Sequence, residues 1–505
     1  MVDFAPSAAE IRAAANDLRL DLDDADIGFY QSIAAIAAQP YARLAQEPDH
    51  LPVSVYPRAA ARRPSAEEDP NNAWYVKAEI LGAETGPLHG KTVAIKDNVC
   101  VASLPMMNGS ATLDGYRPEI DATVVTRLLD AGATIIGKTH CEHFCLSAGS
   151  HTNPCGPTHN PYRRGYTTGG SSSGSAAAVA AGEADLAVGG DQGGSIRAPA
   201  AYCGIYGLKP TWGLVSYTGA MSIDPTLDHL GPMTRTVEDN AIMLEVLAGP
   251  DGLDPRQAAA PVAPSYVEAM KRGVRGLRIG VLAEGFGHPD SKPEIDGKVR
   301  AAANRFVERG AEVVEISIPD HALAPAIWLA ISAEGLTSGL MLAEVRDGGP
   351  RGVHLNSLRE AHARWPERGA ALSESLKTMM LLGRHMTRHH GGLFYGKAQN
   401  LSRRLRASYD QALADVDLLL LPTTPSGPDP LPPEGAPREL ELLAARGFLA
   451  NTCAFNVSGH PALSAPCGMI DGLPVGMMLV GKWYDEASIY RAALAFEQAS
   501  DWRSL

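Results

Sequence analysis

The sequence has little cysteine and no excess of basic residues. It contains 7 cysteines in 505 residues. Their odd number and irregular spacing indicate reduced thiols in the cytosol and argue against a disulfide framework. Lys and Arg total 44 against 57 Asp and Glu, which gives a net charge of −13. This balance argues against a general binder of nucleic acid or of anionic membranes.

Signals for secretion and for membrane insertion are also lacking. The first residues, MVDFAPSAAEIRAAANDLRLDLDD, become acidic early and have no apolar core, so we expect no secretory signal. The most apolar long run, from Ala322 to Val345, is interrupted by Glu334 and by glycines, which predicts a buried helix. We therefore expect a cytoplasmic protein that binds neither membranes nor nucleic acids.

The N-terminal part of the chain has its own pattern. Apolar spacing in residues 26–46 predicts an amphipathic helix that ends before Pro40. Residues 58–72 are rich in charge, Pro and Asn, which is typical of an exposed linker. We predict a helical N-terminal extension with its linker over residues 1–72, followed by one large domain over residues 73–505.

Strand and helix patterns alternate in the large domain. Strands are predicted in TVAIKDN, ATIIGKT, ADLAVGGDQGG, LRIGVLAEGF, AEVVEISIP, DLLLLPTTP and LPVGMMLVG, with helical patterns between most of them. One of these helices is predicted to begin with Asp121 as its N-cap and to end at Gly132. Such alternation favours an α/β fold around a largely buried sheet.

Two pattern matches lack the structural context that their function needs. GATIIGKT (132–139) fits the phosphate-loop pattern, but its loop positions are β-branched residues that favour a strand, so we expect no nucleotide site. HCEHFC (140–145) resembles a metal cluster, but no second ligand pair accompanies it at a typical spacing. We therefore expect neither a metal nor another cofactor.

The most informative stretch runs from Gly169 to Arg197 and contains two glycine–serine clusters, GGSSSGS and DQGGSIR. Glycines beside a serine let backbone N–H groups approach a reacting atom, which an acyl-transfer enzyme needs to stabilise an oxyanion. Lys96, in TVAIKDN upstream, adds a candidate base. The chain thus offers a nucleophile, a relay hydroxyl and a base without a histidine.

With these blocks in this order, the chain resembles the amidase signature family of serine hydrolases. The resemblance begins near Leu88 and also includes GGDQGGSIRAPAAYCGIYGLKPTWGLV, LDHLGPMTRTVEDNA and NVSGHPALSAPCG. It implies a large mixed β-sheet surrounded by many α-helices. Gln192, LDHLGPMTR and the helical extension resemble a subgroup, the bacterial broad-range and enantioselective amidases associated with nitrile hydratases.

The resemblance implies roles for individual residues. Ser195 would be the nucleophile, Ser171 the relay serine and Lys96 the base, and the peptide before Ser171 would be cis. The family's oxyanion hole would consist of the backbone N–H groups of Gln192, Gly193, Gly194 and Ser195. From their positions we expect substrate to contact Gly169, Gly170, Trp328, Asn451 and Phe455. Asp191 and Arg197 are expected to form an ion pair that shapes the nucleophile loop.

For function, the resemblance implies hydrolysis of small aliphatic or aromatic amides through an acyl-enzyme. It also implies a homodimer whose contacts come from the N-terminal helices, with Phe29, Tyr30 and Ile33 on one face. The alternatives are hydrolysis of carbamates, anilides or hydrazides, and a non-catalytic scaffold. A further alternative is the A-type subunit of a glutamine amidotransferase, although such subunits typically carry Thr where this chain has Gln192 and Gln where it has Ala198.

Overall fold

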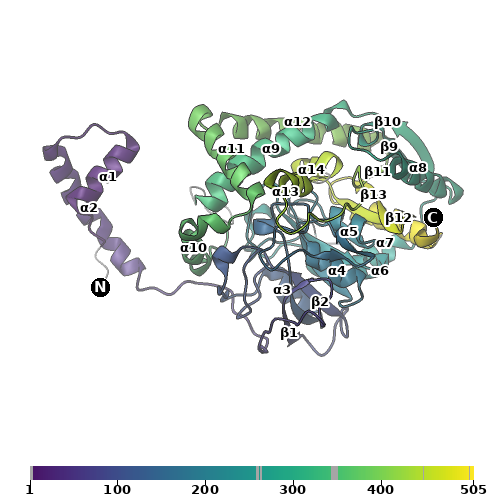
Figure 1. Cartoon of the computed structure of the whole chain (residues 1–505), viewed down its shortest axis with the longest axis horizontal. Coiled ribbons are helices and arrows are strands. Elements are labelled where there is room, and N and C mark those ends of the chain that lie inside the picture. The colour runs from purple at the N-terminus through teal and green to yellow at the C-terminus, as the bar shows by residue number, and fades with distance from the viewer. Residues whose placement is uncertain (1–3, 258–260, 262–263, 343–350, 447–448, 500) are drawn as a thin grey trace. The chain divides into compact units, whose positions relative to one another are not determined.

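The structure of the chain is a computed structural model. It describes residues 4–499 and 501–505, apart from 258–260, 262–263, 343–350 and 447–448. By its internal contacts the chain forms two compact units, Met1–Pro52 and Val53–Leu505. The first unit is the predicted helical extension, and the second contains the sheet (Figure 1).

The first unit is a pair of helices, α1 (Ala8–Leu18) and α2 (Asp24–Leu44). Each begins with a reciprocal capping box. The N-cap side chain accepts the N–H of the third helical residue, and the side chain of that residue accepts the N–H of the N-cap residue. The expected end before Pro40 is wrong, since α2 continues through this residue. Pro40 lies near the end of the helix, where its missing N–H removes only one backbone hydrogen bond.

Residues 58–72 are largely exposed, as expected, but they belong to the second unit and do not link the two units. Arg62 forms an antiparallel bridge with Lys77 of strand β1. Asp69 is buried, and its carboxylate accepts hydrogen bonds from the N–H groups of Ala73 and Trp74, both at 2.8 Å. The polar residues of this segment therefore anchor the chain to the edge of the sheet.

The second unit is built on a large mixed sheet of 11 strands, which confirms the predicted fold class. In spatial order the strands are β1 (Trp74–Leu81), β3 (Thr134–Thr139), β2 (Thr92–Lys96), β6 (Leu186–Asp191), β8 (His229–Thr234), β7 (Tyr206–Lys209), β12 (Ala462–Ile470), β13 (Leu473–Gly481), β11 (Leu418–Pro422), β9 (Arg278–Leu282) and β10 (Glu312–Ile316). Strand β2 runs parallel to both β3 and β6. A separate two-stranded sheet pairs β4 (His159–Asn160) with β5 (Arg163–Thr167).

Helices surround this sheet. They are α3 (Thr123–Asp130), α4 (Ser173–Ala180), α5 (Arg197–Tyr202), α6 (Val237–Leu247), α7 (Tyr266–Met270), α8 (Pro293–Glu308), α9 (Ala324–Gly335), α10 (Asn356–Ala363), α11 (Glu374–His390), α12 (Leu393–Asp415), α13 (Arg438–Arg446), α14 (Leu449–Ser458) and α15 (Glu486–Glu497). Asp121 is not the N-cap of α3; that position is Ala122. The Asp121 carboxylate instead pairs with Arg58 and accepts the Ala102 N–H, so tertiary contacts take the side chain from the helix end.

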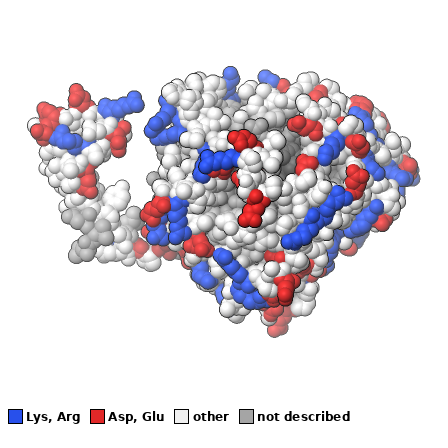
Figure 2. All heavy atoms as spheres, in the orientation of Figure 1, with Lys and Arg blue, Asp and Glu red and all other residues white. Residues whose placement is uncertain are grey.

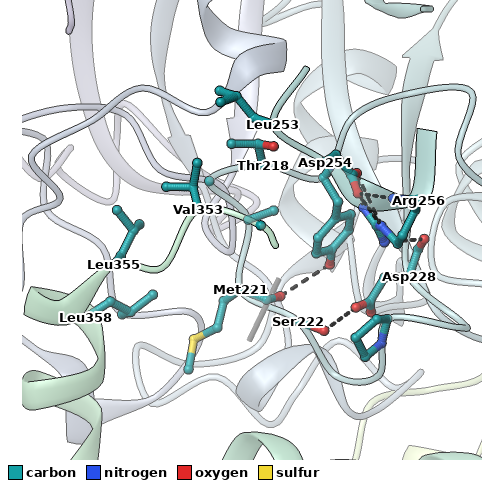
Figure 3. A pocket seen from close by; sticks show the side chains of 15 residues that line it. Thr218, Met221, Ser222, Asp228, Leu253, Asp254, Arg256, Val353, Leu355 and Leu358 are labelled. Atoms are coloured by element: carbon teal, nitrogen blue, oxygen red, sulfur yellow. Dashed lines mark hydrogen bonds and ion pairs between the residues drawn. The ribbon is translucent and has the colours of Figure 1, made fainter. Parts of the chain in front are cut away.

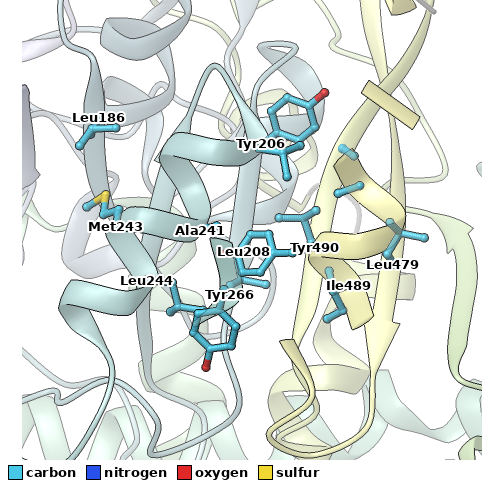
Figure 4. Packing of buried hydrophobic residues seen from close by; sticks show 14 of the residues in the cluster. Leu186, Tyr206, Leu208, Ala241, Met243, Leu244, Tyr266, Leu479, Ile489 and Tyr490 are labelled. Carbon is cyan, nitrogen blue, oxygen red and sulfur yellow. The ribbon is translucent and has the colours of Figure 1, made fainter. Parts of the chain in front are cut away.

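The core consists of apolar side chains from the sheet and from the helices packed on it. In one cluster Tyr206 and Leu208 of β7 face Tyr266 of α7 and Ile489 and Tyr490 of α15 (Figure 4). A second cluster joins α9, α12 and α14 to β11 and β13. These helices gather on one side of the second unit (Figure 1). Burial of this apolar area supplies most of the driving force for folding.

One helical stretch, Pro319–Met341, is long and apolar enough to cross a membrane by length and composition. Its central helix, α9, packs against α11, α12 and α14, and just over half of the stretch is buried. Apolar side chains of this stretch belong to the second core cluster, as expected for a buried helix. On the face shown in Figure 2, basic and acidic side chains are interspersed.

Candidate active site

The candidate site lies at the ends of two adjacent parallel strands. Lys96 is the last residue of β2, and Asp191 is the last residue of β6. Because β2 and β6 pair in parallel, their carboxyl ends meet at the same edge of the sheet. The loop Gln192–Ile196 begins at this edge and leads into α5, so the fold brings the predicted base close to the glycine loop.

Lys96 and Ser171 are in direct contact. The Lys96 amine donates hydrogen bonds to Ser171 Oγ at 2.8 Å and to the Gly190 carbonyl at 3.0 Å. Both side chains are fully buried, whereas Ser195 is partly exposed. The peptide before Ser171 is cis. The next residue, Ser172, donates its N–H to the Ser195 carbonyl at 3.3 Å, which joins the two glycine–serine clusters.

A second buried lysine shows what is distinctive about Lys96. Lys138, on the neighbouring strand β3, is equally buried, but its amine lies 2.9 Å from the Asp97 carboxylate. Across the described part of the chain, no carboxylate lies within ion-pair distance of Lys96. Its hydrogen-bond partners are the Ser171 hydroxyl, the Gly190 carbonyl and the Cys145 thiol. The base candidate therefore lacks the carboxylate counter-ion that the neighbouring lysine has.

The glycine loop is shaped by the Asp191 carboxylate. This group accepts the N–H of Gly194 at 2.8 Å and that of Ile196 at 3.0 Å. Gly194 was expected to donate to an oxyanion, but this N–H is already engaged, so that assignment is corrected. The N–H groups of Gln192, Gly193 and Ser195 have no recorded acceptor among the described residues.

The expected ion pair between Asp191 and Arg197 is present and completely buried. The guanidinium donates two hydrogen bonds to the carboxylate, both at 3.0 Å, and a third to Asn456 Oδ1 at 2.7 Å. Burial by itself would raise the pKa of Asp191, but Arg197 and Asn456 outweigh it and hold the pKa well below its usual range. Asp191 therefore stays ionised and keeps the loop in one shape.

Two side chains from the helical half of the unit fix the loop peptides. Trp328 Nε1 donates to the Gln192 carbonyl at 2.7 Å, and Thr452 Oγ1 donates to the Gly193 carbonyl at 2.6 Å. The loop must be glycine here, since a Cβ at Gly193 would lie 2.9 Å from both Trp328 Nε1 and Leu449 Cδ2. Leu449 was not anticipated from the sequence, and Gly447 and Phe448, just before it, lie outside the described residues.

The other expected substrate contacts have structural roles in the fold. Asn451 is fully buried and donates to the carbonyls of Gly285 and Pro422 at 2.9 and 2.8 Å. Phe455 is fully buried in the second core cluster. Helix α14 therefore turns these two side chains into the protein and presents Leu449 and Thr452 to the loop.

Gly169 and Gly170 are buried where the chain is crowded. Gly169 has a φ of +73°, and a Cβ there would lie 3.1 Å from Pro199 Cα. A Cβ at Gly170 would lie 2.8 Å from both Glu142 Cγ and the Ser147 carbonyl. Both positions therefore require glycine for close backbone packing next to Ser171.

The HCEHFC segment contacts the site through a thiol. Burial would raise the pKa of Cys145, but a hydrogen bond with Cys141 and the nearby Lys96 and Ser171 together outweigh it and lower the pKa. The same thiol is within hydrogen-bonding reach of Ser171. The structure places no group of three or more His, Cys, Asp or Glu side chains, in the residues it describes, where they could hold a metal ion.

A tyrosine that the sequence did not single out links the segments that follow the two strands of the site. The Tyr217 hydroxyl accepts hydrogen bonds from Gln192 Nε2 at 2.8 Å and from Asn98 Nδ2 at 3.3 Å. Its own segment borders a small cavity of about 60 Å³. In Figure 3, Met221, Ser222 and Asp228 lie along this segment, across from leucine and valine side chains of residues 353–358.

Comparison with known proteins agrees with this geometry. Residues 60–490 match the amidase family. The chain is 45% identical to an enantioselective amidase of Rhodococcus rhodochrous, over 91% of this chain and 87% of the relative. It is 39% identical to the A-type subunit of a glutamyl-tRNA(Gln) amidotransferase of Methanosarcina acetivorans, over 85% and 88%. The crystal structure of a peptide amidase from Stenotrophomonas maltophilia superposes with a TM-score of 0.69 at 33% identity, covering 82% of this chain and 83% of that one.

The chain therefore belongs to the amidase signature family of hydrolases. The similarity to the Rhodococcus enzyme extends over nine-tenths of the sequence, and the similarity to amidotransferase subunits is also substantial.

Proposed function

We propose that the chain hydrolyses carboxamides to a carboxylic acid and ammonia or an amine, through an acyl-enzyme on Ser195. The observation that carries this proposal is the buried contact between Lys96 and Ser171 beside a partly exposed serine on a glycine loop. In its neutral form, the Lys96 amine takes a proton from Ser171. Ser171 takes one from Ser195, whose oxygen then attacks the amide carbonyl.

The glycine loop supplies the stabilisation of charge. The N–H groups of Gly193 and Ser195, with that of Gln192, are the donors for the oxyanion, and each such donor contributes about 3–4 kcal/mol to catalysis in other hydrolases. Ser171 then returns its proton to the departing nitrogen, and water hydrolyses the ester.

Small uncharged amides are the proposed substrates. The loop is flanked at Gly193 by Trp328 and Leu449, an aromatic and an aliphatic side chain that suit an apolar acyl group. Carbamates, anilides and hydrazides present an equivalent carbonyl to the same serine. Measuring kcat/KM for these compounds, for benzamide and for aliphatic amides would rank them as substrates. Hydroxylamine added to the reaction should divert an acyl-enzyme to a hydroxamate.

The similarity to amidotransferase subunits supports a second candidate, release of ammonia from glutamine. That reaction needs groups that bind an α-carboxylate and an α-ammonium, whereas Trp328 and Leu449 are uncharged; desolvating an unpaired ammonium beside them would be costly. Purified protein should hydrolyse benzamide without a partner and prefer it to glutamine. Preference for glutamine, or turnover only with a partner protein, would favour the second candidate.

For assembly we propose a cytoplasmic homodimer formed through the N-terminal helices. Phe29, Tyr30, Ile33 and Ile36 are large apolar side chains that remain 47–64% exposed on α2. Removing residues 1–57 should convert a dimer to a monomer in light scattering. If the truncated protein were still a dimer, the dimer contact would lie elsewhere. If the full-length protein were already a monomer, the proposed dimer would be ruled out.

A further inference from the structure

Two buried side-chain amides beside the Lys96–Ser171 pair have carbonyl oxygens without a partner. Asn98 follows Lys96 by two residues and is 0% exposed; Gln192 opens the glycine loop and is 3% exposed. Within the described chain neither Asn98 Oδ1 nor Gln192 Oε1 has a hydrogen-bond partner. Buried acceptors are almost always satisfied in folded proteins, so this pair fits a donor that arrives with a ligand.

The Tyr217 hydroxyl determines which way both amides face. It accepts from the NH₂ groups of Gln192 and Asn98, and it donates its own proton to the Met221 carbonyl at 3.2 Å. Because both NH₂ groups turn toward the same oxygen, both carbonyl oxygens turn away from it. A reversed amide could bond the hydroxyl only by accepting the single proton that now goes to the Met221 carbonyl, so the two amides cannot both reverse and keep their bonds to the hydroxyl.

Tyr217 is itself held by two further contacts. Its N–H donates to Asp254 Oδ2 at 2.8 Å, and the guanidinium of Arg256 stacks on its ring with 4.8 Å between guanidinium carbon and ring centroid. Burial raises the pKa of Tyr217 well above its usual value, so the hydroxyl keeps its proton. A fixed, protonated hydroxyl of this kind can position other side chains.

The two side-chain amides lie close to the proposed reacting groups. A Cβ at Gly190 would be 3.3 Å from the Asn98 side-chain nitrogen and 3.5 Å from the Lys96 amine, so these two side chains face the same point of the backbone. Gln192 immediately precedes Gly193, whose N–H is a proposed oxyanion donor. In a carboxamide the NH₂ group is attached to the same carbon as the oxygen that such a donor would bind.

Resting on the proposed function, we propose that Asn98 and Gln192 form a recognition site for the nitrogen of a primary carboxamide. Their carbonyl oxygens accept its two N–H bonds, and Tyr217 is the positioning residue that holds them in this orientation. The site then selects primary amides over esters and over amides whose nitrogen carries no hydrogen, because neither of the latter can satisfy the two acceptors.

The test compares two substrates that give the same acyl-enzyme, benzamide and methyl benzoate, together with N,N-dimethylbenzamide. In Gln192→Met, Asn98→Leu and Tyr217→Phe we expect kcat/KM for benzamide to fall about 10- to 100-fold. The value for methyl benzoate, which has no N–H, should fall less in each variant, so that the ratio of the benzamide value to the methyl benzoate value drops by about 10-fold or more. The wild-type protein should turn over N,N-dimethylbenzamide poorly, and the variants should not lower this rate further.

Tyr490→Phe is the matched control, since Tyr490 is also buried and its hydroxyl bonds Asn240 at 2.8 Å, away from the site. It should leave the amide-to-ester ratio unchanged even where it lowers the melting temperature. Equal losses for benzamide and methyl benzoate in the three variants would overturn nitrogen recognition. A wild-type protein that hydrolyses neither substrate, or a Ser195→Ala variant that hydrolyses both, would instead refute the proposed function.

Discussion

The candidate site has two walls of opposite character. The polar wall, formed by Lys96, Ser171, Gln192 and Tyr217, comes from strand ends and the loops that follow them, and its side chains are tied together by hydrogen bonds. The apolar wall, formed by Trp328 and Leu449, comes from helices α9 and α14 of the second core cluster. The proposed chemistry thus depends on the polar wall, and the fit of the acyl group depends on the apolar wall.

Two buried acids near the polar wall have pKa values that are shifted in opposite directions. Asp191 is ionised because Arg197 and Asn456 compensate its burial. Asp228 lies on the Tyr217 segment, where burial raises its pKa to about 7 against the opposing effects of Arg256 and Ser222. A buried carboxylate can therefore be compensated by a paired cation, or its burial can instead raise the pKa and favour the neutral form.

The largest expected effect is on catalysis and belongs to the polar wall. Ser195→Ala and Lys96→Met should each lower kcat for benzamide by on the order of 10⁴-fold or more, and the double variant should lose little beyond that, because the residues act as a unit. Initial rates by ammonia release would measure this. Ser173→Ala is the control, since its hydroxyl is also buried and, among the residues that the structure describes, hydrogen-bonds only the His140 carbonyl, at 3.4 Å. A comparable loss in this variant would mean that the cluster matters only for packing.

The next effect is on stability. Arg197→Ala removes one partner of a completely buried ion pair, so the free energy of unfolding should fall by about 3–5 kcal/mol. Arg305→Ala breaks the half-exposed pair with Glu308 and should cost less than about 1 kcal/mol. Urea unfolding followed by circular dichroism would compare the two. Equal values would show that the buried pair does not stabilise the loop.

The pH dependence of the Asp191 contribution has a definite sign. The folded-state pKa is below the unfolded value of about 4, so the contribution is fully present above that pH. It is lost as the pH falls through the folded-state value. The difference in stability between the wild type and Arg197→Ala should therefore shrink in acid, and a difference that grows in acid would contradict the assignment.

The polar wall could be predicted from the sequence far better than the apolar wall. Lys96, Ser171 and the glycine loop lie in short blocks whose residue types are tied to chemistry. Trp328 was expected to bind substrate, and it lies beside the loop. Asn451 and Phe455 were also expected there, but which face of α14 turns inward depends on packing against distant helices. Tyr217 gave no signal because its contacts join residues far apart in the chain.

The same distinction applies to the fold. Alternating patterns predicted the α/β class and several strands, including β3 in the stretch that matches a phosphate loop. Local rules failed where tertiary contacts compete with them, as at Asp121, whose carboxylate is taken by Arg58 and Ala102. Strand order and the mixture of parallel and antiparallel pairs could not be deduced locally, because they depend on contacts between distant segments.

A smaller effect should distinguish the two buried acids. The folded-state pKa of Asp228 lies above the unfolded value of about 4, so this group favours the folded state below both values and costs stability as the pH rises toward about 7. The wild type should be about 2 kcal/mol less stable at pH 8 than at pH 5 through this group. Asp228→Asn should lack that slope, as denaturant curves at the two pH values would show. An unchanged slope would mean that Asp228 is ionised in the fold.

The smallest effect tests the bond that joins the two walls. Trp328 Nε1 binds the carbonyl of the peptide whose N–H belongs to Gly193, and in a trans peptide these two groups point in opposite directions. Trp328→Phe keeps an aromatic ring but frees this peptide to turn, so kcat for benzamide should fall about 5- to 10-fold while KM changes little, as expected for a contact that aims an oxyanion donor. Trp365→Phe is the matched control, because that indole also donates to a backbone carbonyl at 2.7 Å, that of Met341, outside the loop. If Trp328→Phe instead raised KM at constant kcat, the indole would serve only as part of the apolar wall, and the two walls would act independently.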